Sequence, residues 1–303
     1  MPPLGDLSGR RIVVTGANSG IGFETARALA AHGAEVVMAC RSTSRAQAAA
    51  AHLRGAPGAV VVRHLDLADL SSIRRFAEEA AGDGALSGVV ANAAVMACPL
   101  SFTADGLELQ MGTNHFGHAL LVFLLLPLLD RAGRVVIVSS IAARGGRLDA
   151  RMQAVDLTAP SPYRAQTVYS NSKQANLLFA KELQRRLRAA GSGTAVIAVH
   201  PGVSATELFP RQMRDNHMGF LVPVLKPVMG LILQSAAAGA LPSLRALSDP
   251  ALGGGEFLGP RRLGQTRGRP ELLGPYRQGA DDEAATRLFE LTEEVLGTGL
   301  LAP

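Results

Sequence analysis

Short runs of β-branched residues alternate with alanine- and leucine-rich segments from residue 11 onward. The runs have the length of buried strands, and the segments between them have the length and composition of helices. Strands that alternate with helices form a parallel sheet, because each right-handed crossover lays a helix on one face of the sheet. The alternation therefore predicts an α/β fold: one doubly wound parallel sheet with helices on both faces and a ligand crevice beyond the carboxyl ends of the strands.

The expected elements occupy residues 9–262, which predicts a single domain over that range. Strands are expected at residues 12–15, 35–39, 59–63, 88–91, 134–138 and 194–199, with an edge strand at 255–258. Helices are expected to begin near Gly20, Arg45, Ser71, Asp105, Tyr169 and Ser235. Residues 263–303 form the C-terminal segment. The Gly-, Arg- and Pro-rich stretch 261–275 predicts a surface tail at its start, and the helical spacing of apolar residues in 281–296 predicts an amphipathic helix that packs on the domain.

Composition and charge argue against several other classes of protein. The net charge is +5, but the arginines are scattered and lack the interleaved aromatic residues of a nucleic-acid platform. Cys40 and Cys98 are too few for a disulfide framework, and no Cys/His spacing fits a metal site. Residues 1–10 lack the apolar core of an export signal, and the apolar runs 120–129 and 220–233 are interrupted before they reach the ~18 residues of a membrane span. We expect a cytoplasmic protein with no metal, nucleic-acid partner or transmembrane segment.

A glycine-rich turn follows the first expected strand and opens the first expected helix. It reads Thr15-Gly16-Ala17-Asn18-Ser19-Gly20-Ile21-Gly22. Glycines let the main chain approach a pyrophosphate closely, and a helix amino terminus offers N–H groups and a favourable dipole. The turn alone is also compatible with an ordinary strand-to-helix connection, because its spacing is not the usual G-x-G-x-x-G. As a dinucleotide site it would use Gly16, Asn18, Ser19, Gly20, Ile21 and Gly22.

The spacing of this turn resembles the T-G-x-x-x-G-x-G turn of the short-chain dehydrogenase/reductase family, and further marks of that family follow in order within residues 9–260. They are Asp66-Leu67, Asn92-Ala93-Ala94, Asn114, Ser140, Tyr169 with Lys173, and Pro201-Gly202-Val203 with Thr206. Ala94 stands where the family usually has glycine, and its methyl group should be tolerated beside the ribose. The resemblance implies a Rossmann-type domain that binds a nicotinamide dinucleotide through these segments and interconverts a carbonyl and an alcohol by hydride transfer.

Several segments are similar to the retinol dehydrogenase-like and protochlorophyllide reductase-like branch of that family. They are residues 38–41, 92–99 and 113–118, together with the long separation between Ser140 and Tyr169. That branch implies an apolar carbonyl or alcohol substrate. It also implies self-association, as a homodimer or homotetramer. We expect the substrate to meet an apolar lid formed by residues 204–234.

Tyr169 and Lys173 lie four residues apart, so on a helix they share a face. A free tyrosine titrates at about 10, and an adjacent ammonium is expected to lower that pKa and assist proton exchange at neutral pH. Ser140 would hydrogen-bond the substrate oxygen. The resemblance implies that Lys173 also holds the nicotinamide ribose and that Asn114 holds a water linking Lys173 to solvent. These four are the candidate catalytic residues.

The end of the second expected strand bears on the choice of cofactor. A site that prefers NAD(H) usually places a carboxylate there, but this chain has Arg41 and Ser42. A guanidinium can bind a 2′-phosphate through two parallel hydrogen bonds. We therefore expect NADP(H), with NAD(H) the weaker ligand.

Two alternatives stay open at this point. The same residues would serve alcohol oxidation as well as carbonyl reduction, and a redox-sensing protein could hold NADP(H) without turnover; Tyr169 and Lys173 argue against the sensor. The remaining candidates are expected to be structural. His115 and His118 should be packing and surface residues, His200 should be structural, and Cys40 and Cys98 should be small buried side chains.

Overall fold

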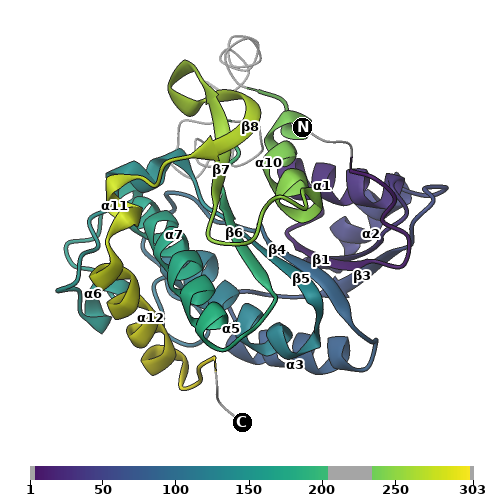
Figure 1. Cartoon of the computed structure of the whole chain (residues 1–303). Coiled ribbons are helices and arrows are strands. Elements are labelled where there is room, and N and C mark those ends of the chain that lie inside the picture. Colours follow the sequence, from purple (N-terminus) through teal and green to yellow (C-terminus); the bar gives the residue numbers. More distant parts are fainter. Residues whose placement is uncertain (1–3, 204–233, 301–303) are drawn as a thin grey trace, which may run out of the picture.

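A computed structural model describes residues 4–203 and 234–300. They form one eight-stranded sheet in the order β3-β2-β1-β4-β5-β6-β7-β8, with helices on both faces (Figure 1). The strands are β1 (Arg11–Thr15), β2 (Glu35–Cys40), β3 (Val60–His64), β4 (Leu86–Ala91), β5 (Leu129–Val138), β6 (Ala195–Val199), β7 (Phe257–Arg262) and β8 (Arg267–Leu273). All neighbours pair in parallel except β7 and β8. The doubly wound Rossmann-type sheet expected from the sequence is confirmed.

The helices divide between the two faces of the sheet. One face carries α1 (Gly20–Ala31), α2 (Thr43–Ala51) and α10 (Ala236–Ser248). The other carries α3 (Leu70–Ala81), α5 (Gly117–Leu125), α7 (Ala165–Ala189) and α12 (Asp282–Leu296). Shorter helices are α4 (Leu109–Met111), α6 (Ala154–Thr158) and α11 (Arg277–Ala280). Each of the six helix starts expected from the sequence therefore has a helix nearby.

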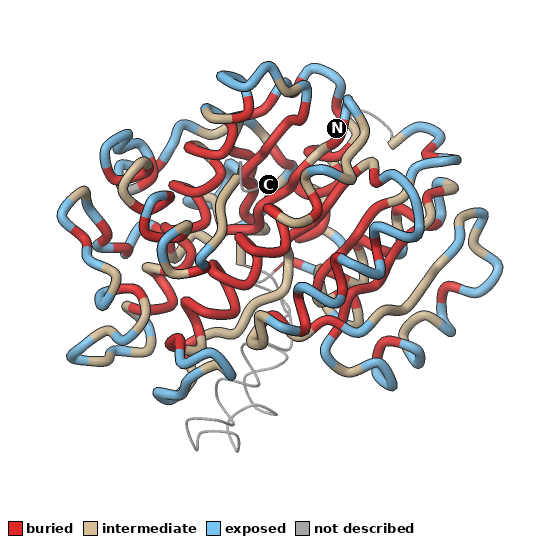
Figure 2. Tube along the Cα trace, turned by 90° about the horizontal axis from the view of Figure 1, so that it is seen from below, coloured by how far each residue is buried: buried red, intermediate tan, exposed pale blue. Residues whose placement is uncertain are grey.

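The alternation of side chains along the strands produces two separate hydrophobic cores. Val13 packs into the core shared with α3, α5 and α7, whereas its neighbour Val14 packs into the core beneath α1 and α10. Val89 and Val90 on β4 divide in the same way. The central strands are therefore buried on both faces, as Figure 2 shows, and this leaves the ends of the strands as the place for polar side chains.

The stretch 261–275 differs from the expected surface tail, because residues 267–273 form β8 at the edge of the sheet. β8 runs antiparallel to β7, with Phe257 opposite Leu273 and Pro260 opposite Pro270. Proline cannot donate to a sheet ladder, so an edge strand is one of the few places where it is tolerated. The glycines and prolines that suggested a loop are those of an irregular edge hairpin.

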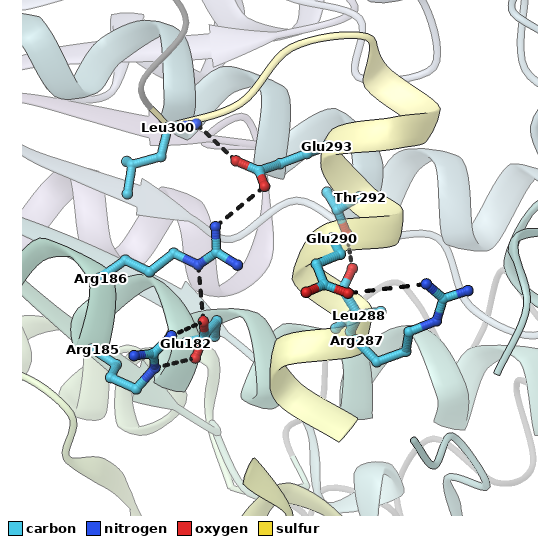
Figure 3. Close-up of polar contacts among 9 residues, drawn as sticks. All are labelled: Glu182, Arg185, Arg186, Arg287, Leu288, Glu290, Thr292, Glu293 and Leu300. Atoms are coloured by element: carbon cyan, nitrogen blue, oxygen red, sulfur yellow. Dashed lines mark hydrogen bonds and ion pairs between the residues drawn. The ribbon is translucent and has the colours of Figure 1, made fainter. Parts of the chain in front are cut away.

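The expected amphipathic C-terminal helix is α12, and it packs along α7. The Phe289 ring stacks on Phe179 with centroids 5.5 Å apart, and it meets Phe123 edge-on at the same distance. Arg186 of α7 lies 4.1 Å from the centroid of the Phe289 ring and pairs with Glu293 at 3.3 Å (Figure 3). The run 120–129 begins within α5, and its Phe123 is part of the core that α12 completes.

The residues from Leu109 to Leu128 are long and apolar enough as a helix to cross a membrane. In this fold 78% of that window is buried inside the domain, against the sheet and the helices beside it. Its apolar character is explained by that position. No other helix in the described ranges passes the same test of length and composition.

Candidate active site

Asn114, Ser140, Tyr169 and Lys173 meet beyond the carboxyl ends of β4 and β5. Asn114 lies in a π-helical turn, Gly112–Phe116, and Ser140 precedes the short helix Ile141–Gly145. Tyr169 and Lys173 lie on the first turns of α7. The sequence placed these residues in separate elements, and the structure brings them together. The chain thereby assembles a proton donor, two polar partners and a cation in one place.

Tyr169 is buried, with 6% of its surface exposed, and its phenol hydrogen-bonds the Ser140 side chain. Burial raises the pKa of Tyr169, and the hydrogen bond with Ser140 opposes that rise. The expectation that Lys173 would lower this pKa is not met, because the cost of burying a phenolate outweighs any nearby charge. The phenol is therefore protonated at neutral pH, in the form that can donate to a substrate oxygen.

The Lys173 ammonium donates to the main-chain carbonyl of Val138 at 3.1 Å. The Asn176 side chain donates to the same carbonyl, also at 3.1 Å. Lys173 is 3% exposed, and its burial lowers its pKa from 10.5 to about 8. The ammonium of Lys173 is thus held at the end of β5 by Val138, which lies two residues before Ser140. Its proton is less tightly bound than that of a free lysine.

The Asn114 side chain fastens a loop to helix α7. Its carbonyl oxygen accepts the N–H of Val95 at 2.8 Å, and its amide donates to the Val95 carbonyl at 2.9 Å and to Ser172 Oγ at 3.0 Å. A π-helical turn widens the helix locally and is often found at functional sites. Here it directs a fully buried amide toward the loop that follows β4.

The glycine turn forms a cradle that side chains would fill. Gly16 and Gly20 have φ angles of 66° and 55°, which favour glycine. A Cβ on Gly22 would lie 2.5 Å from the Gly16 carbonyl oxygen and 2.6 Å from Asn92 Nδ2. Ser19 precedes α1 without capping it through its side chain, so the first N–H groups of α1 can bind an anion.

Thr15, which the sequence analysis did not select, anchors the loop after β4. Its hydroxyl oxygen accepts the N–H groups of Asn92 and Ala93, both at 2.9 Å, and its carbonyl accepts Asn92 Nδ2 at the same distance. The hydroxyl also lies 2.9 Å from Nε2 of His118. His118 is buried and not a surface residue. Its spacing from Asn114, one helical turn, was the available signal.

The other expected cofactor residues lie around the same edge of the sheet. Arg41 is exposed at the end of β2, and Ser42 caps α2 by accepting the N–H of Arg45 at 3.4 Å. Asp66 Oδ1 accepts the N–H of Ala68 at 3.0 Å and shapes the turn after β3, and Leu67 is buried there. Ala94 is half-buried in the loop held by Asn114.

Pro201, Gly202 and Val203 follow β6. Gly202 has a φ of 70° and donates its N–H to Nδ1 of His200 at 3.1 Å, while the N–H of Val203 donates to the Thr266 carbonyl at 2.8 Å. His200 is therefore structural, as expected. Thr206 and all of the expected lid except Gln234 lie outside the described residues. Among the described residues no group of His, Cys, Asp and Glu could hold a metal ion.

Comparison with known proteins assigns this chain to a family. The model of the family described as short chain dehydrogenase matches residues 10–151. Retinol dehydrogenase 13 of Homo sapiens is 37% identical over 304 residues, which cover 98% of this chain and 87% of that protein. The chain belongs to the short-chain dehydrogenase/reductase family.

This short-chain dehydrogenase/reductase is also similar to a second retinol dehydrogenase and to a solved bacterial structure. Retinol dehydrogenase 12 of Homo sapiens is 46% identical over 207 residues, which cover 67% of this chain and 64% of that protein. A solved structure of an uncharacterized protein from Mycobacterium paratuberculosis is 42% identical, covers 98% of this chain and 97% of that one, and superposes with a TM-score of 0.80. The expected resemblance to the retinol dehydrogenase-like branch is confirmed.

Proposed function

We propose that this short-chain dehydrogenase/reductase is an NADP(H)-dependent enzyme that interconverts an apolar ketone or aldehyde and the corresponding alcohol. The observation that carries the proposal is the protonated, buried Tyr169 phenol bonded to Ser140, with Lys173 one helical turn away. A binding protein that only sensed the redox state would have no use for a buried acid at this position. The sensor is therefore the second candidate.

The residues of the cradle fit a dinucleotide. Gly16, Gly20 and Gly22 keep side chains out of the space at the start of α1, whose N–H groups favour a pyrophosphate. When bound, the nicotinamide supplies or takes up the hydride. Asn92, Ala93 and Ala94 would border the ribose, and residues 201–203 would border the nicotinamide.

Proton transfer is the task of the chain itself. In reduction the Tyr169 hydroxyl donates its proton to the substrate oxygen, while the Ser140 hydroxyl donates a second hydrogen bond that stabilises the charge growing there. Ser140 Oγ already accepts the N–H of Ala142 at 3.2 Å, which fixes its position. Lys173, whose pKa falls to about 8, would hold the nicotinamide ribose and supply the proton that restores the Tyr169 phenol. Asn114 would hold a water at the outer end of this path.

For the cofactor we propose NADP(H), supported by Arg41 at the end of β2. Its side chain is exposed and free to turn toward a 2′-phosphate, and the end of β2 carries no carboxylate that would repel one. The neighbouring residue Ser42 could donate a second hydrogen bond to the same phosphate through its hydroxyl.

For the substrate we propose a retinoid or a similarly long apolar aldehyde or alcohol, because relatives over most of the chain are named retinol dehydrogenases. The test is turnover of NADPH by the purified chain with retinal and with a panel of short ketones and aldehydes. Consumption of NADPH with retinal above all others supports the proposal. Tight NADPH binding without turnover of any carbonyl would favour the sensor.

We propose the reducing cytoplasm as the compartment, because two cysteines in 303 residues are too few for a disulfide framework. Self-association as a homodimer or homotetramer also stays a proposal. Any such interface would have to avoid the face of α7 that α12 covers. For the partner we propose a small apolar molecule.

A further inference from the structure

His118 is buried, and both of its ring nitrogens have polar partners. Nδ1 lies 3.1 Å from the main-chain carbonyl of Asn114, and Nε2 lies 2.9 Å from the Thr15 hydroxyl. Neither atom belongs to the buried side-chain atoms that lack a partner, which include Nδ1 of His115 and Nε2 of His200. His118 thus bonds through both sides of its ring.

The partners determine the tautomer. A carbonyl oxygen only accepts, so Nδ1 must carry the proton that is donated to Asn114. Burial and the nearby charge of Lys173 lower the pKa of His118 from 6.5 to about 4, so the ring is neutral and Nε2 is an acceptor. The Thr15 hydroxyl must therefore donate to Nε2. That leaves its lone pairs for the N–H groups of Asn92 and Ala93.

Without an acceptor at position 118, the Thr15 hydroxyl would turn to its other acceptor within reach, the Val90 carbonyl, which lies 3.3 Å away. Its lone pairs would then rotate away from the loop after β4. That loop touches the glycine cradle directly, because a Cβ on Gly16 would lie 3.0 Å from the Ala93 Cβ. The orientation of one hydroxyl is thus coupled to the wall of the cradle.

We propose that His118 is a positioning residue for both halves of the site: its Nδ1–H fixes the main chain at Asn114, and its Nε2 fixes Thr15 and through it residues 92–93 of the dinucleotide cradle. The proposal rests on the proposed function where it concerns NADPH. It also predicts an effect on the protein alone, because the N–H groups of Asn92 and Ala93 are bonded to Thr15 without any cofactor.

Two substitutions separate the two sides of the ring. The side-chain carbonyl of glutamine can take the place of Nε2, so His118→Gln should keep Thr15 oriented and lose the contact with Asn114. Asparagine is shorter, so the amide of His118→Asn can donate to the Asn114 carbonyl but cannot reach Thr15. His118→Leu removes both contacts. His115→Gln is the matched control, since His115 is equally buried but bonds Thr292 of α12 at 2.8 Å.

Hydrogen exchange of a peptide containing residues 92–93, NADPH affinity, kcat and Tm are measured for each variant. We expect His118→Asn and His118→Leu to speed exchange and weaken NADPH binding by about five- to tenfold, the worth of one hydrogen bond. His118→Gln should stay within about twofold of the parent in both and lose kcat instead. His115→Gln should lower Tm alone. Equal effects of Gln and Asn on exchange, or an unchanged His118→Leu, would overturn the proposal.

If the leucine variant does not fold, a double-mutant cycle with Thr15→Val still tests whether His118 acts through Thr15. Thr15→Val should speed exchange at residues 92–93 in the parent and add little in His118→Asn, because the coupling is already broken there. Additive effects would show that His118 does not act through Thr15. If the parent binds no NADPH, the proposed function fails, and the exchange measurements still decide the role of His118.

Discussion

The Lys173 ammonium donates to the Val138 carbonyl at 3.1 Å, in a position with only 3% of the residue exposed. Lys173 has no carboxylate partner among the described residues, so its desolvation cost is uncompensated there, and burial lowers its pKa to about 8. The site therefore keeps a cation where the fold alone would favour a neutral side chain. A destabilising buried charge at a site indicates that the residue is retained for function at the expense of stability.

Lys173→Met should make the protein more stable and less active. The Val138 carbonyl keeps its bond from Asn176, so no acceptor is left unpaired. At neutral pH the variant should gain up to roughly 3 kcal/mol in the free energy of unfolding, the equivalent of the pKa shift, while kcat collapses. Urea unfolding and turnover assays on both proteins check this. A variant less stable than the parent would contradict the account of the burial cost.

The same shift gives the parent a pH-dependent stability. Below pH 8 Lys173 is protonated in both states and the burial cost is fully present. Between about 8 and 10.5 the folded protein sheds the proton and the unfolded chain keeps it, so this group makes stability rise with pH. The difference in unfolding free energy between parent and Lys173→Met should therefore shrink across that window. A constant difference would mean that the lysine titrates normally.

Arg41 should decide the preference between the two cofactors. NADPH is expected to bind at least about tenfold more tightly than NADH, since a charge-assisted contact contributes roughly 1.5–3 kcal/mol. Arg41→Asp should reverse the order, because a carboxylate repels the 2′-phosphate and can bind ribose hydroxyls. Fluorescence titration of both cofactors with both proteins measures this. Equal dissociation constants in the parent would remove the argument for NADP(H).

The cradle should not accept a methyl group. Gly22→Ala would place its Cβ 2.5 Å from the Gly16 carbonyl oxygen and should weaken dinucleotide binding by more than about tenfold or unfold the turn. Gly82→Ala is the control: its Cβ would meet only the Glu79 carbonyl oxygen, at 3.5 Å. That control should bind NADPH like the parent. Similar affinities for the two variants would show that the turn does not hold the cofactor.

Phe289 should matter for stability and little for chemistry. It stacks on Phe179 in the contact between α12 and α7, and its ring is fully buried. Phe289→Ala should cost about 3–5 kcal/mol in the free energy of unfolding, as large-to-small changes in a core do. At low temperature the folded fraction should retain the parent kcat. A loss of less than about 1 kcal/mol would mean that α12 is not part of the core.

The sequence predicted the elements that are specified by local pattern and missed what depends on packing. Val13 and Val14 lie in a short β-branched run, and such runs marked the six expected strands between residues 12 and 199. β8 was missed because Pro270 suggested a loop, and only the pairing with β7 explains it. His118 and Thr15 were missed because they are 103 residues apart in sequence, and only the packing of α5 against β1 brings the ring of His118 to the Thr15 hydroxyl. The pKa of Tyr169 was expected to fall, but burial, which no motif reveals, raises it.

We propose that Tyr169 donates the proton while the rest of the site holds cofactor and substrate. Tyr169→Phe keeps the buried ring and removes only the hydroxyl that bonds Ser140. The most direct test measures NADPH affinity and kcat for this variant with the best carbonyl substrate. We expect NADPH affinity within about threefold of the parent and kcat lower by about 10²–10⁴-fold. A variant that kept most of the parent's kcat would contradict the assignment of Asn114, Ser140, Tyr169 and Lys173 as one catalytic unit.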